Sequence, residues 1–281
     1  MDQDERQLHA SSFGAVADAY AAHRPDYARA AVRWALEPAP GPRVLDLGAG
    51  TGKLTATLVV LGADVIAVEP DTGMRTELRH SLPGVRALPG SAEAIPLPDA
   101  SVDAVLAGNA MHWFDMATAG PEIARVLAPD GVLAGLWNLM DDQVEWVAAL
   151  ARVGGDAAVG SRDTPAAWRA ETAAMHLPGD GAAARFGWPR QAEFPHGQRR
   201  TADSLVATLA TRAGMLVMPE PERDATLARI HAFLATRPGD RPRRVHSPDA
   251  DRCAARTATV TVKRRPGTRR SPTAPGRRAA W

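Results

Sequence analysis

A glycine-rich turn at residues 48–52 constrains the fold of this chain more than any other feature. Residues 43–47, RVLDL, predict a short apolar strand, which runs through GAGTG into the helical pattern LTATLVVL at 54–61. Glycines at 48, 50 and 52 allow the backbone to turn tightly and to approach a ligand closely. The segment therefore predicts a strand–turn–helix unit that opens a ligand-binding α/β domain.

Strands and helices alternate beyond this turn. Apolar runs predict further strands at 63–69, 85–88, 102–108 and 131–138, with helical patterns at 72–82 and 119–127 between them. This alternation and spacing predict βαβ units and a parallel sheet. A sixth strand is expected within AEFPHGQRR.

Four regions are expected along the chain. Residues 1–40 predict an N-terminal helical cap, with two helices broken near Arg24-Pro25, and residues 41–140 form the core. Residues 141–236 predict a helical insertion that completes the substrate side, with a Gly-, Pro- and Ala-rich part at 154–190. Residues 237–281 form a basic tail without apolar periodicity, for which disorder is the default expectation.

Composition limits the location and partners of the protein. The 281 residues contain no long apolar run, the charged N-terminus does not resemble a secretory signal, and Cys253 is the single cysteine. We therefore expect a cytoplasmic protein with no membrane span and no metal site. The tail from residue 237 carries 13 basic and 3 acidic residues, net +10, which leaves the other residues at −9. This acidic body disfavours a nucleic-acid partner, although the tail alone could attract nucleic acid or a membrane surface.

Charge near the turn indicates the kind of ligand. The spacing GxGxG differs from the GxGxxG of dinucleotide binders, and Asp46 would repel a pyrophosphate but favour a cationic ligand. Glu69 ends the next strand, where an acidic side chain reaches ribose hydroxyls, and Met74 follows where it can pack against an adenine ring. The alternatives are a purely structural turn and a solvated loop charge.

These segments resemble a known family. VLDLGAGTGK, VIAVEP, GSAEAIPLPDASVDAV and EIARVLAPDGVL are similar to the successive motifs of class I S-adenosylmethionine (SAM)-dependent methyltransferases, and most similar to the methyltransferase type 11 group. The resemblance covers about Phe13 to Asn138. It implies a Rossmann-like, doubly wound, mostly parallel sheet of about seven strands, with N-terminal helices and a helical insertion after strand five. It also implies methyl transfer from SAM to a small-molecule acceptor, such as a carboxylate or a hydroxyl.

The resemblance implies a cofactor site by position. The glycine turn would line the methionine moiety, the acidic residue before it would face this moiety indirectly, and GSAE would lie beside the adenine amino group. The family often has Asp where this chain has Glu93. The cofactor residues implied within the core are Asp46, Gly48, Ala49, Gly50, Gly52, Glu69, Met74, Ala92, Glu93 and Asn109.

Two further elements refine the resemblance. Residues 20–27 resemble a YxxxRPxY element in which Tyr20 and Arg24 would lie near the cofactor carboxylate; alternatively, Arg24 caps a helix and Tyr20 is a core residue. Residues 109–115 resemble the AxHWF element of trans-aconitate methyltransferase-like enzymes. His112 is the candidate catalytic residue there, as a base or as a hydrogen-bond donor to a substrate carboxylate. Alternatively, His112 and Trp113 only pack the loop.

Other functions with the same fold stay open at the level of sequence. A nicotinamide-dependent oxidoreductase is disfavoured by the glycine spacing and by Asp46. A non-catalytic SAM-binding protein would keep the same turn. A nucleic-acid methyltransferase lacks an NPPY-like or catalytic cysteine motif here. No motif specifies an oligomeric state.

The tail raises a separate hypothesis. Members of the resembled family end in an antiparallel strand that no segment of this tail clearly provides. Codons can be chosen for residues 245–261 whose +1 frame reads FTLPMLTGVLRVRRL, a strand-like sequence, so the tail is interpreted as disordered or as a translated frameshift that the nucleotide sequence would test. Alternatively, TATVTVK at 257–263 alternates like a strand and could fill the vacancy.

Overall fold

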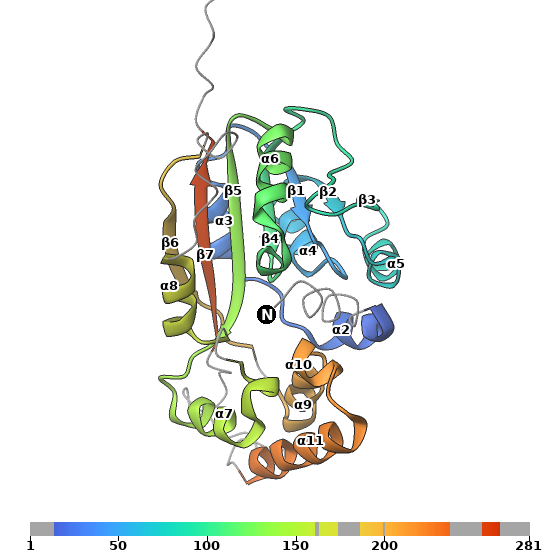
Figure 1. Ribbon diagram of the computed structural model, residues 1–281, viewed down its shortest axis with the longest axis vertical. Coiled ribbons are helices and arrows are strands. Elements are labelled where there is room, and N and C mark those ends of the chain that lie inside the picture. Colours follow the sequence, from blue (N-terminus) through green and yellow to red (C-terminus); the bar gives the residue numbers. More distant parts are fainter. Residues whose placement is uncertain (1–13, 161–162, 174–185, 199, 237–254, 265–281) are drawn as a thin grey trace, which may run out of the picture.

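A single seven-stranded sheet organises the chain, as the computed structural model shows (Figure 1). The structure describes residues 14–160, 163–173, 186–198, 200–236 and 255–264. The strand order is β3-β2-β1-β4-β5-β7-β6, in which β1 to β5 are parallel and β7 is antiparallel to both neighbours. The strands are β1 (Arg43–Leu47), β2 (Asp64–Val68), β3 (Arg86–Leu88), β4 (Val102–Gly108), β5 (Leu127–Met140), β6 (Arg190–Pro195) and β7 (Ala255–Lys263).

Helices cover both faces of this sheet and form a separate layer beyond its lower end in Figure 1. They are η1 (Gly14–Val16), α2 (Ala17–His23), α3 (Arg29–Leu36), α4 (Lys53–Val60), α5 (Thr72–Ser81), η2 (Met111–Trp113), α6 (Met116–Val126), α7 (Glu145–Ala158), α8 (Pro165–Ala173), α9 (Ala202–Ala210), α10 (Ala213–Leu216) and α11 (Glu220–Ala235). Within the described ranges, no helix has the length and apolar character needed to cross a membrane.

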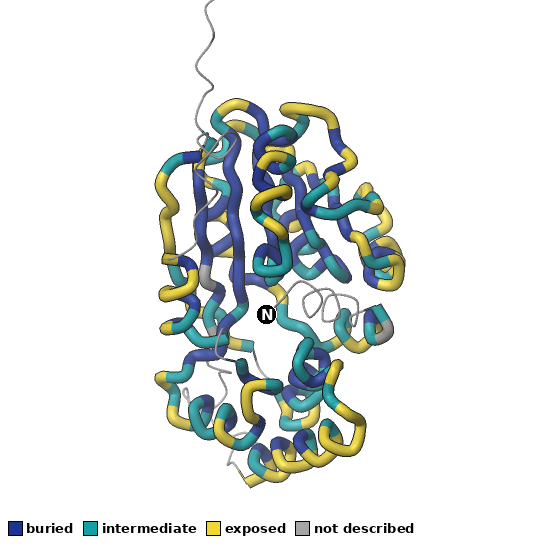
Figure 2. The backbone as a smooth tube through the Cα atoms, viewed as in Figure 1, coloured by how far each residue is buried: buried dark blue, intermediate teal, exposed yellow. Residues whose placement is uncertain are grey.

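The core is divided between the two faces of the sheet. Buried side chains of α3 and α4 pack on one face, and those of α6 and α8 pack on the other. A third cluster joins α7, α9, α10 and α11 into the helical region. Figure 2 shows buried residues along the central strands and exposed residues on the outer sides of these helices. The predicted Rossmann-like, mostly parallel sheet is therefore confirmed.

Individual boundaries differ where long-range pairing decides them. β1 and β4 span the ranges expected from their apolar patterns, whereas β5 begins four residues earlier, at Leu127. Leu127 pairs with Val102 across an irregularity in the β4–β5 register, which a local pattern does not encode. The Gly-, Pro- and Ala-rich segment at 154–190, for which little secondary structure or a few short helices are expected, includes the short helix α8, and residues 174–185 lie outside the described part of the chain.

The C-terminal strand differs from the main expectation for the tail. Residues 255–263 form β7, which lies between β5 and β6 and pairs with β5 from Val132↔Lys263 to Met140↔Ala255. Thr257 also accepts a hydrogen bond from the backbone N–H of Ala28, at 3.1 Å, which ties the strand to the N-terminal helices. The strand position that motivated the frameshift hypothesis is therefore filled by the chain's own TATVTVK segment. The rest of the tail, including Cys253, lies outside the described residues.

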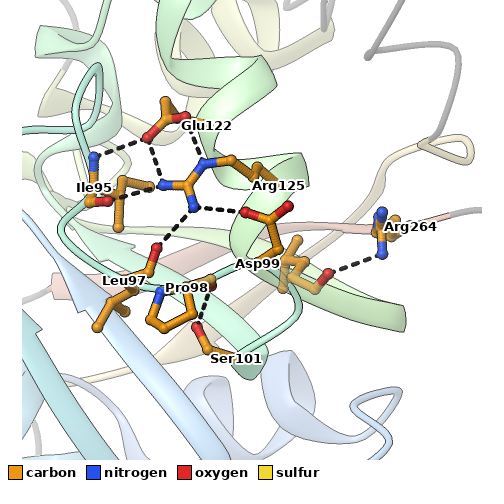
Figure 3. A network of polar contacts seen from close by, with 9 residues as sticks. Ile95, Leu97, Pro98, Asp99, Ser101, Glu122, Arg125 and Arg264 are labelled. Atoms are coloured by element: carbon orange, nitrogen blue, oxygen red, sulfur yellow. Dashed lines mark hydrogen bonds and ion pairs between the residues drawn. The ribbon is translucent and has the colours of Figure 1, made fainter.

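Arg125 on α6 fixes the loop between β3 and β4 (Figure 3). Its guanidinium donates to the backbone carbonyl oxygens of Leu97 and Ile95, at 2.7 and 2.9 Å, and pairs with Glu122 and Asp99. The Glu122 carboxylate also accepts from the N–H of Ile95, at 3.1 Å. The neighbouring carboxylates raise the pKa of Arg125 and keep it charged. One arginine thus holds four loop and helix residues in place.

We expect Arg125→Met to lower the free energy of unfolding by about 3 kcal/mol, because carbonyl and carboxylate groups would lose a charged donor. Chemical denaturation at pH 7 measures this effect. Arg152→Met, at an exposed position of α7, is the matched control and should change stability by less than about 0.5 kcal/mol. Equal stability of the two variants would contradict a structural role for the Arg125 network.

Candidate functional site

One large cavity opens where the parallel strands end. Its volume is about 1040 Å³, and its wall includes residues that follow β1, β2 and β4 and residues in the last part of β5, together with residues of α2 and the helical region. Strand order reverses between β1 and β4, so the cavity lies at the topological switch point of the sheet. Open α/β sheets bind ligands at this place, outside the carboxyl ends of the strands.

The glycine turn after β1 forms one side of the cavity. Gly48 and Gly50 have φ values of 70° and 56°, which favour glycine, and both line the cavity. The N–H of Gly48 donates to the carbonyl oxygen of Val68, at 2.9 Å, and a Cβ on Gly48 would lie 2.8 Å from that of Ala110. A Cβ on Gly50 would meet no atom within 4 Å. The turn therefore leaves open space for a ligand at Gly50.

Glu69 follows β2 and faces this turn. Its carboxylate accepts hydrogen bonds from the N–H of Gly50, at 2.8 Å, and of Asp71, at 2.9 Å. Burial raises the pKa of Glu69, and these two hydrogen bonds oppose the increase. Met74 is buried in the next helix and also lines the cavity. An acidic group and an apolar surface thus lie next to each other, as ribose and adenine would require.

The loop after β3 contributes Ala92 and Glu93 to the cavity wall. The carboxylate of Glu93 accepts a hydrogen bond from the N–H of Asp115, at 3.0 Å, so this longer side chain connects the loop to the start of α6. Asn109 lines the cavity with φ 49°. Its side-chain oxygen accepts from the N–H of Asn138, at 3.0 Å, and joins the ends of β4 and β5.

The N-terminal segment covers the cavity from another side. Tyr20 and Arg24 both line it, with the guanidinium of Arg24 4.8 Å from the ring centroid of Tyr20. Arg24 is the last-turn cap of α2, and its side chain donates to the carbonyl oxygen of Thr211, at 3.0 Å. The backbone of Arg24 therefore caps helix α2, while its guanidinium places a positive charge at the cavity wall. Tyr20 is half-buried at this wall and is not a core residue.

His112 lies on the η2 turn after β4, at the cavity wall. Its ring contacts that of Trp113, with centroids 4.6 Å apart, and both side chains are half-buried.

The end of β5, α8 and the helical region form the remaining wall, which is aromatic and charged. Trp137, at the end of β5, and Trp168, on α8, have ring centroids 6.2 Å apart. Arg212 lines the cavity and forms an ion pair with Asp163. The exposed side chains of Asp156 and Glu171 also lie at this wall.

Three predicted cofactor residues do not lie on the cavity wall. Asp46 is fully buried and faces α4, where Thr55 donates a hydrogen bond to it at 2.6 Å. Burial raises the pKa of Asp46 to about 7. Ala49 points away from the cavity into a small cluster with Leu78. Gly52 caps α4 with φ 87°, and a Cβ there would press on Leu78 at 3.0 Å.

The structure also adds residues that the motif reading did not select. Trp113 and Phe114 were part of the AxHWF resemblance, so their place at the wall had a signal. Trp137 ends a predicted strand, but nothing distinguished it from a core residue. Trp168 and Arg212 lie in the insertion, where the sequence has no motif, and only the tertiary fold brings them to the cavity.

This chain is similar in sequence to known methyltransferases. A family model described as a methyltransferase domain matches residues 45–135. An uncharacterized methyltransferase of Mycobacterium tuberculosis is 41% identical over 227 residues, which cover 81% of this chain and 87% of the relative. A malonyl-[acyl-carrier protein] O-methyltransferase of Methylococcus capsulatus is 36% identical over 143 residues, 47% of this chain and 52% of the relative.

A solved structure supports the same relationship. A candidate type II methyltransferase from Anaeromyxobacter dehalogenans superposes with a TM-score of 0.54 and 27% identity, covering 86% of this chain and 97% of the other. The similarity therefore extends over the sheet and most of the helical region.

Proposed function

We propose a cofactor-binding mode, a catalytic base and an acceptor chemistry for this chain, which belongs to the class I SAM-dependent methyltransferases. The predicted family and enzyme class are confirmed by this membership, and the nicotinamide-dependent oxidoreductase considered from the sequence is set aside. The family and the fold imply SAM as the cofactor. The reaction that we propose is methylation of a small molecule at a carboxylate or hydroxyl oxygen.

The residues at the cavity fit SAM. Gly50 leaves space where any side chain would intrude, and the buried carboxylate of Glu69 lies beside it to accept hydrogen bonds from ribose hydroxyls. Arg24 would bind the cofactor carboxylate, and Met74 would cover the adenine. The cofactor sulfonium and ammonium suit the acidic groups around the turn, including the buried Asp46. This combination carries the proposal.

The proposed methyl transfer depends mainly on how the protein positions the acceptor relative to SAM. SAM supplies a methyl group that is activated by the positive charge of its sulfur. The cavity walls align the acceptor oxygen with this methyl group and exclude water, which accounts for much of the acceleration in such displacements. His112 would accept the proton of a hydroxyl acceptor, whereas a carboxylate acceptor would need no base at neutral pH.

The proposal that oxygen is the acceptor atom rests on the name of one relative. The Methylococcus capsulatus protein, which matches 47% of this chain, is named for O-methylation of malonyl-[acyl-carrier protein]. This name supports oxygen as the acceptor atom. The small-molecule character is supported by the concave cavity of about 1040 Å³ and by the acidic body of the chain.

Titration of the purified protein with SAM, and separately with NAD, tests the proposed cofactor. We expect saturable micromolar binding of SAM and no response to NAD. Incubation with labelled SAM and a panel of hydroxyl and carboxyl compounds then tests for turnover. A folded protein that binds no SAM would refute the proposed function, and one that binds SAM without any turnover would support the non-catalytic alternative.

The role of Glu69 gives a specific prediction. We expect Glu69→Gln to weaken SAM binding about thirtyfold, because the amide would lose a charge-assisted bond to the ribose and would repel one backbone N–H. Glu77→Gln, on the helix that follows, serves as the control and should leave the affinity within about twofold. An analogue of SAM that contains 3′-deoxyribose should bind the wild type much more weakly than SAM does. For Glu69→Gln, the difference in affinity between SAM and this analogue should be much smaller. If both proteins discriminate equally against the analogue, Glu69 does not bind the ribose.

The proposed role of His112 as a base gives a second specific prediction. With a hydroxyl acceptor, His112→Gln is expected to lower kcat about a hundredfold and to leave the affinity for S-adenosylhomocysteine unchanged. The pH profile of kcat should lose its lower limb in the variant, because that limb reports loss of a proton from the base. His80→Gln, exposed on α5, is the control. An unchanged profile in His112→Gln would leave this residue with a packing role only.

A further inference from the structure

We infer that Thr257, in the C-terminal strand β7, is a positioning residue for the cofactor, because it holds the N-terminal segment that brings Arg24 to the cavity. The inference rests on the proposed function, in which Arg24 binds the cofactor carboxylate. Thr257 itself is not among the residues of the cavity wall, so its effect on the cofactor is exerted through this segment.

Residues 24–28 connect α2 to α3 without forming a helix. Arg24 begins this connection at the cavity wall, and Ala28 ends it in the core, where it is 5% exposed. Pro25 lies between them and restricts its own backbone and that of the preceding residue. Because the connection is so short and restricted, we expect a displacement at Ala28 to move Arg24 as well.

The side chain of Thr257 bonds both to this connection and to the neighbouring strand. Its oxygen accepts a hydrogen bond from the N–H of Ala28, at 3.1 Å, and its O–H donates to Oδ1 of Asn138, at 2.9 Å. Nδ2 of Asn138 in turn donates to the carbonyl oxygen of Asp26, at 2.9 Å. Asn138 and Thr257 are paired residues of β5 and β7. These three hydrogen bonds, called the Thr257 bridge below, fix the connection at two points against two inner strands of the sheet.

The Thr257 bridge requires a hydroxyl group at position 257. This residue is 0% exposed, so bulk water does not reach its hydroxyl. A hydroxyl accepts one hydrogen bond while it donates another, and its donation to Oδ1 directs the amide nitrogen of Asn138 towards Asp26. Valine has nearly the same shape but would leave the N–H of Ala28 without its acceptor, which is costly for a buried group. We expect the connection to shift until this N–H finds another partner, so that Arg24 moves relative to the glycine turn.

Contacts from other directions limit the size of this effect. Arg24 also donates to the carbonyl oxygen of Thr211, at 3.0 Å, and the ring of His196 contacts the carboxylate of Asp26, at 3.0 Å. These contacts remain when the Thr257 bridge is removed. We therefore expect weaker binding of the cofactor carboxylate instead of its complete loss.

Thr259 provides a matched control on the same strand. It lies two residues further along β7, so it faces the same side of the sheet, and it is also 0% exposed. Within the part of the chain that the structure describes, its hydroxyl has no hydrogen-bond partner. Thr259→Val therefore makes the same chemical change in the same strand without removing a hydrogen bond to the connection.

Two ligands, measured by calorimetry, separate the cofactor carboxylate from the rest of the molecule. They are S-adenosylhomocysteine and its decarboxylated analogue, which keeps the adenosine and the amine. We expect the wild type to bind S-adenosylhomocysteine about thirtyfold more tightly than the analogue, because the analogue cannot bond to Arg24. Thr257→Val should bind S-adenosylhomocysteine about tenfold more weakly than the wild type does, and the analogue within about twofold. Thr259→Val should match the wild type with both ligands, and Thr257→Ser, which keeps the hydroxyl, should stay within about threefold.

A second variant and a second measurement test the Thr257 bridge independently. Asn138→Ser removes the donor to Asp26 and leaves Thr257 in place, and it should lose affinity for S-adenosylhomocysteine selectively, by about fivefold. Hydrogen–deuterium exchange of the ligand-free proteins should be faster at residues 24–28 in Thr257→Val and Asn138→Ser than in the wild type. Thr259→Val should exchange at the wild-type rate there.

The outcomes distinguish this inference from the proposed function. A wild type that binds no S-adenosylhomocysteine would refute the proposed function, and a wild type that binds both ligands equally would refute the role of Arg24 and this inference with it. If the wild type discriminates between the ligands, retained affinity for S-adenosylhomocysteine in Thr257→Val and Asn138→Ser would overturn only the inference about Thr257. An equal loss of both ligands would do the same. Asn138→Ser decides between these outcomes by itself if Thr257→Val does not fold.

Discussion

Gly50→Arg is expected to abolish measurable SAM binding, with an affinity loss of at least about a thousandfold, while the protein stays folded. The backbone at Gly50 has φ 56°, and a Cβ there would point into the open space of the cavity. An arginine would therefore fill the volume that the methionine moiety needs, and its charge would repel the sulfonium. Calorimetric titration with SAM measures the loss.

A matched variant separates this effect from backbone strain. Gly62→Arg introduces the same side chain at φ 82°, where a Cβ also meets no atom within 4 Å, but Gly62 does not line the cavity. Both variants should lose about 1–2 kcal/mol of stability, because an L-residue is strained in the left-handed region. Only Gly50→Arg should lose SAM binding. Retention of SAM affinity within about tenfold in Gly50→Arg would show that the cofactor does not occupy this space.

Local chemistry made part of the site predictable from sequence. The turn after β1, the acidic end of β2 and the helix that contains Met74 each depend on a few adjacent residues. The resulting prediction placed Gly48, Gly50 and Glu69 at one cavity, and the structure brings them there. Asp46 shows the limit of such reasoning, because its carboxylate points to Thr55 on α4, a direction set by alternation along the strand.

The cavity wall formed by β5, α8 and the helical region was not predictable because it depends on contacts between distant segments. Trp168 meets Trp137 only after α8 packs against the sheet, and Arg212 reaches the cavity through its pairing with Asp163. β7 illustrates the same point for the fold. Its short alternating pattern is weak by itself, and its place is determined by nine paired positions along β5. Non-local pairing of this kind leaves little trace in a local sequence window.

The buried carboxyl of Asp46 should make stability depend on pH. Burial raises its pKa from 3.8 to about 7, so the folded protein holds a proton that the unfolded chain releases between these values. The contribution of Asp46 to the free energy of unfolding should therefore be most favourable below pH 4. It should fall as pH rises towards 7, by about 4 kcal/mol in total.

Asp46→Asn isolates this contribution, because the amide imitates the protonated carboxyl and can still accept the hydrogen bond from Thr55. Denaturation curves at several pH values should show similar stability of variant and wild type near pH 3.5, and a variant more stable by up to about 4 kcal/mol near pH 8. Asp64→Asn, at an exposed position of β2, is the control and should follow the wild-type curve. Parallel curves for Asp46→Asn and the wild type would contradict the assignment.

The Asp46 carboxyl is expected to weaken the fold at neutral pH, and we propose that it compensates by attracting the cationic cofactor. Asp46 is the next-to-last residue of β1, two positions before Gly48, and it is fully buried, so its ionised form would attract the sulfonium and ammonium groups through a poorly screened interior. We therefore expect SAM to bind the wild type more tightly at pH 8 than at pH 6, and Asp46→Asn to lose this pH dependence. The variant should thus gain stability and lose cofactor affinity at the same pH, which is the trade-off expected of a binding residue. A variant that gains stability and keeps full SAM affinity at pH 8 would show that Asp46 serves only the packing of α4.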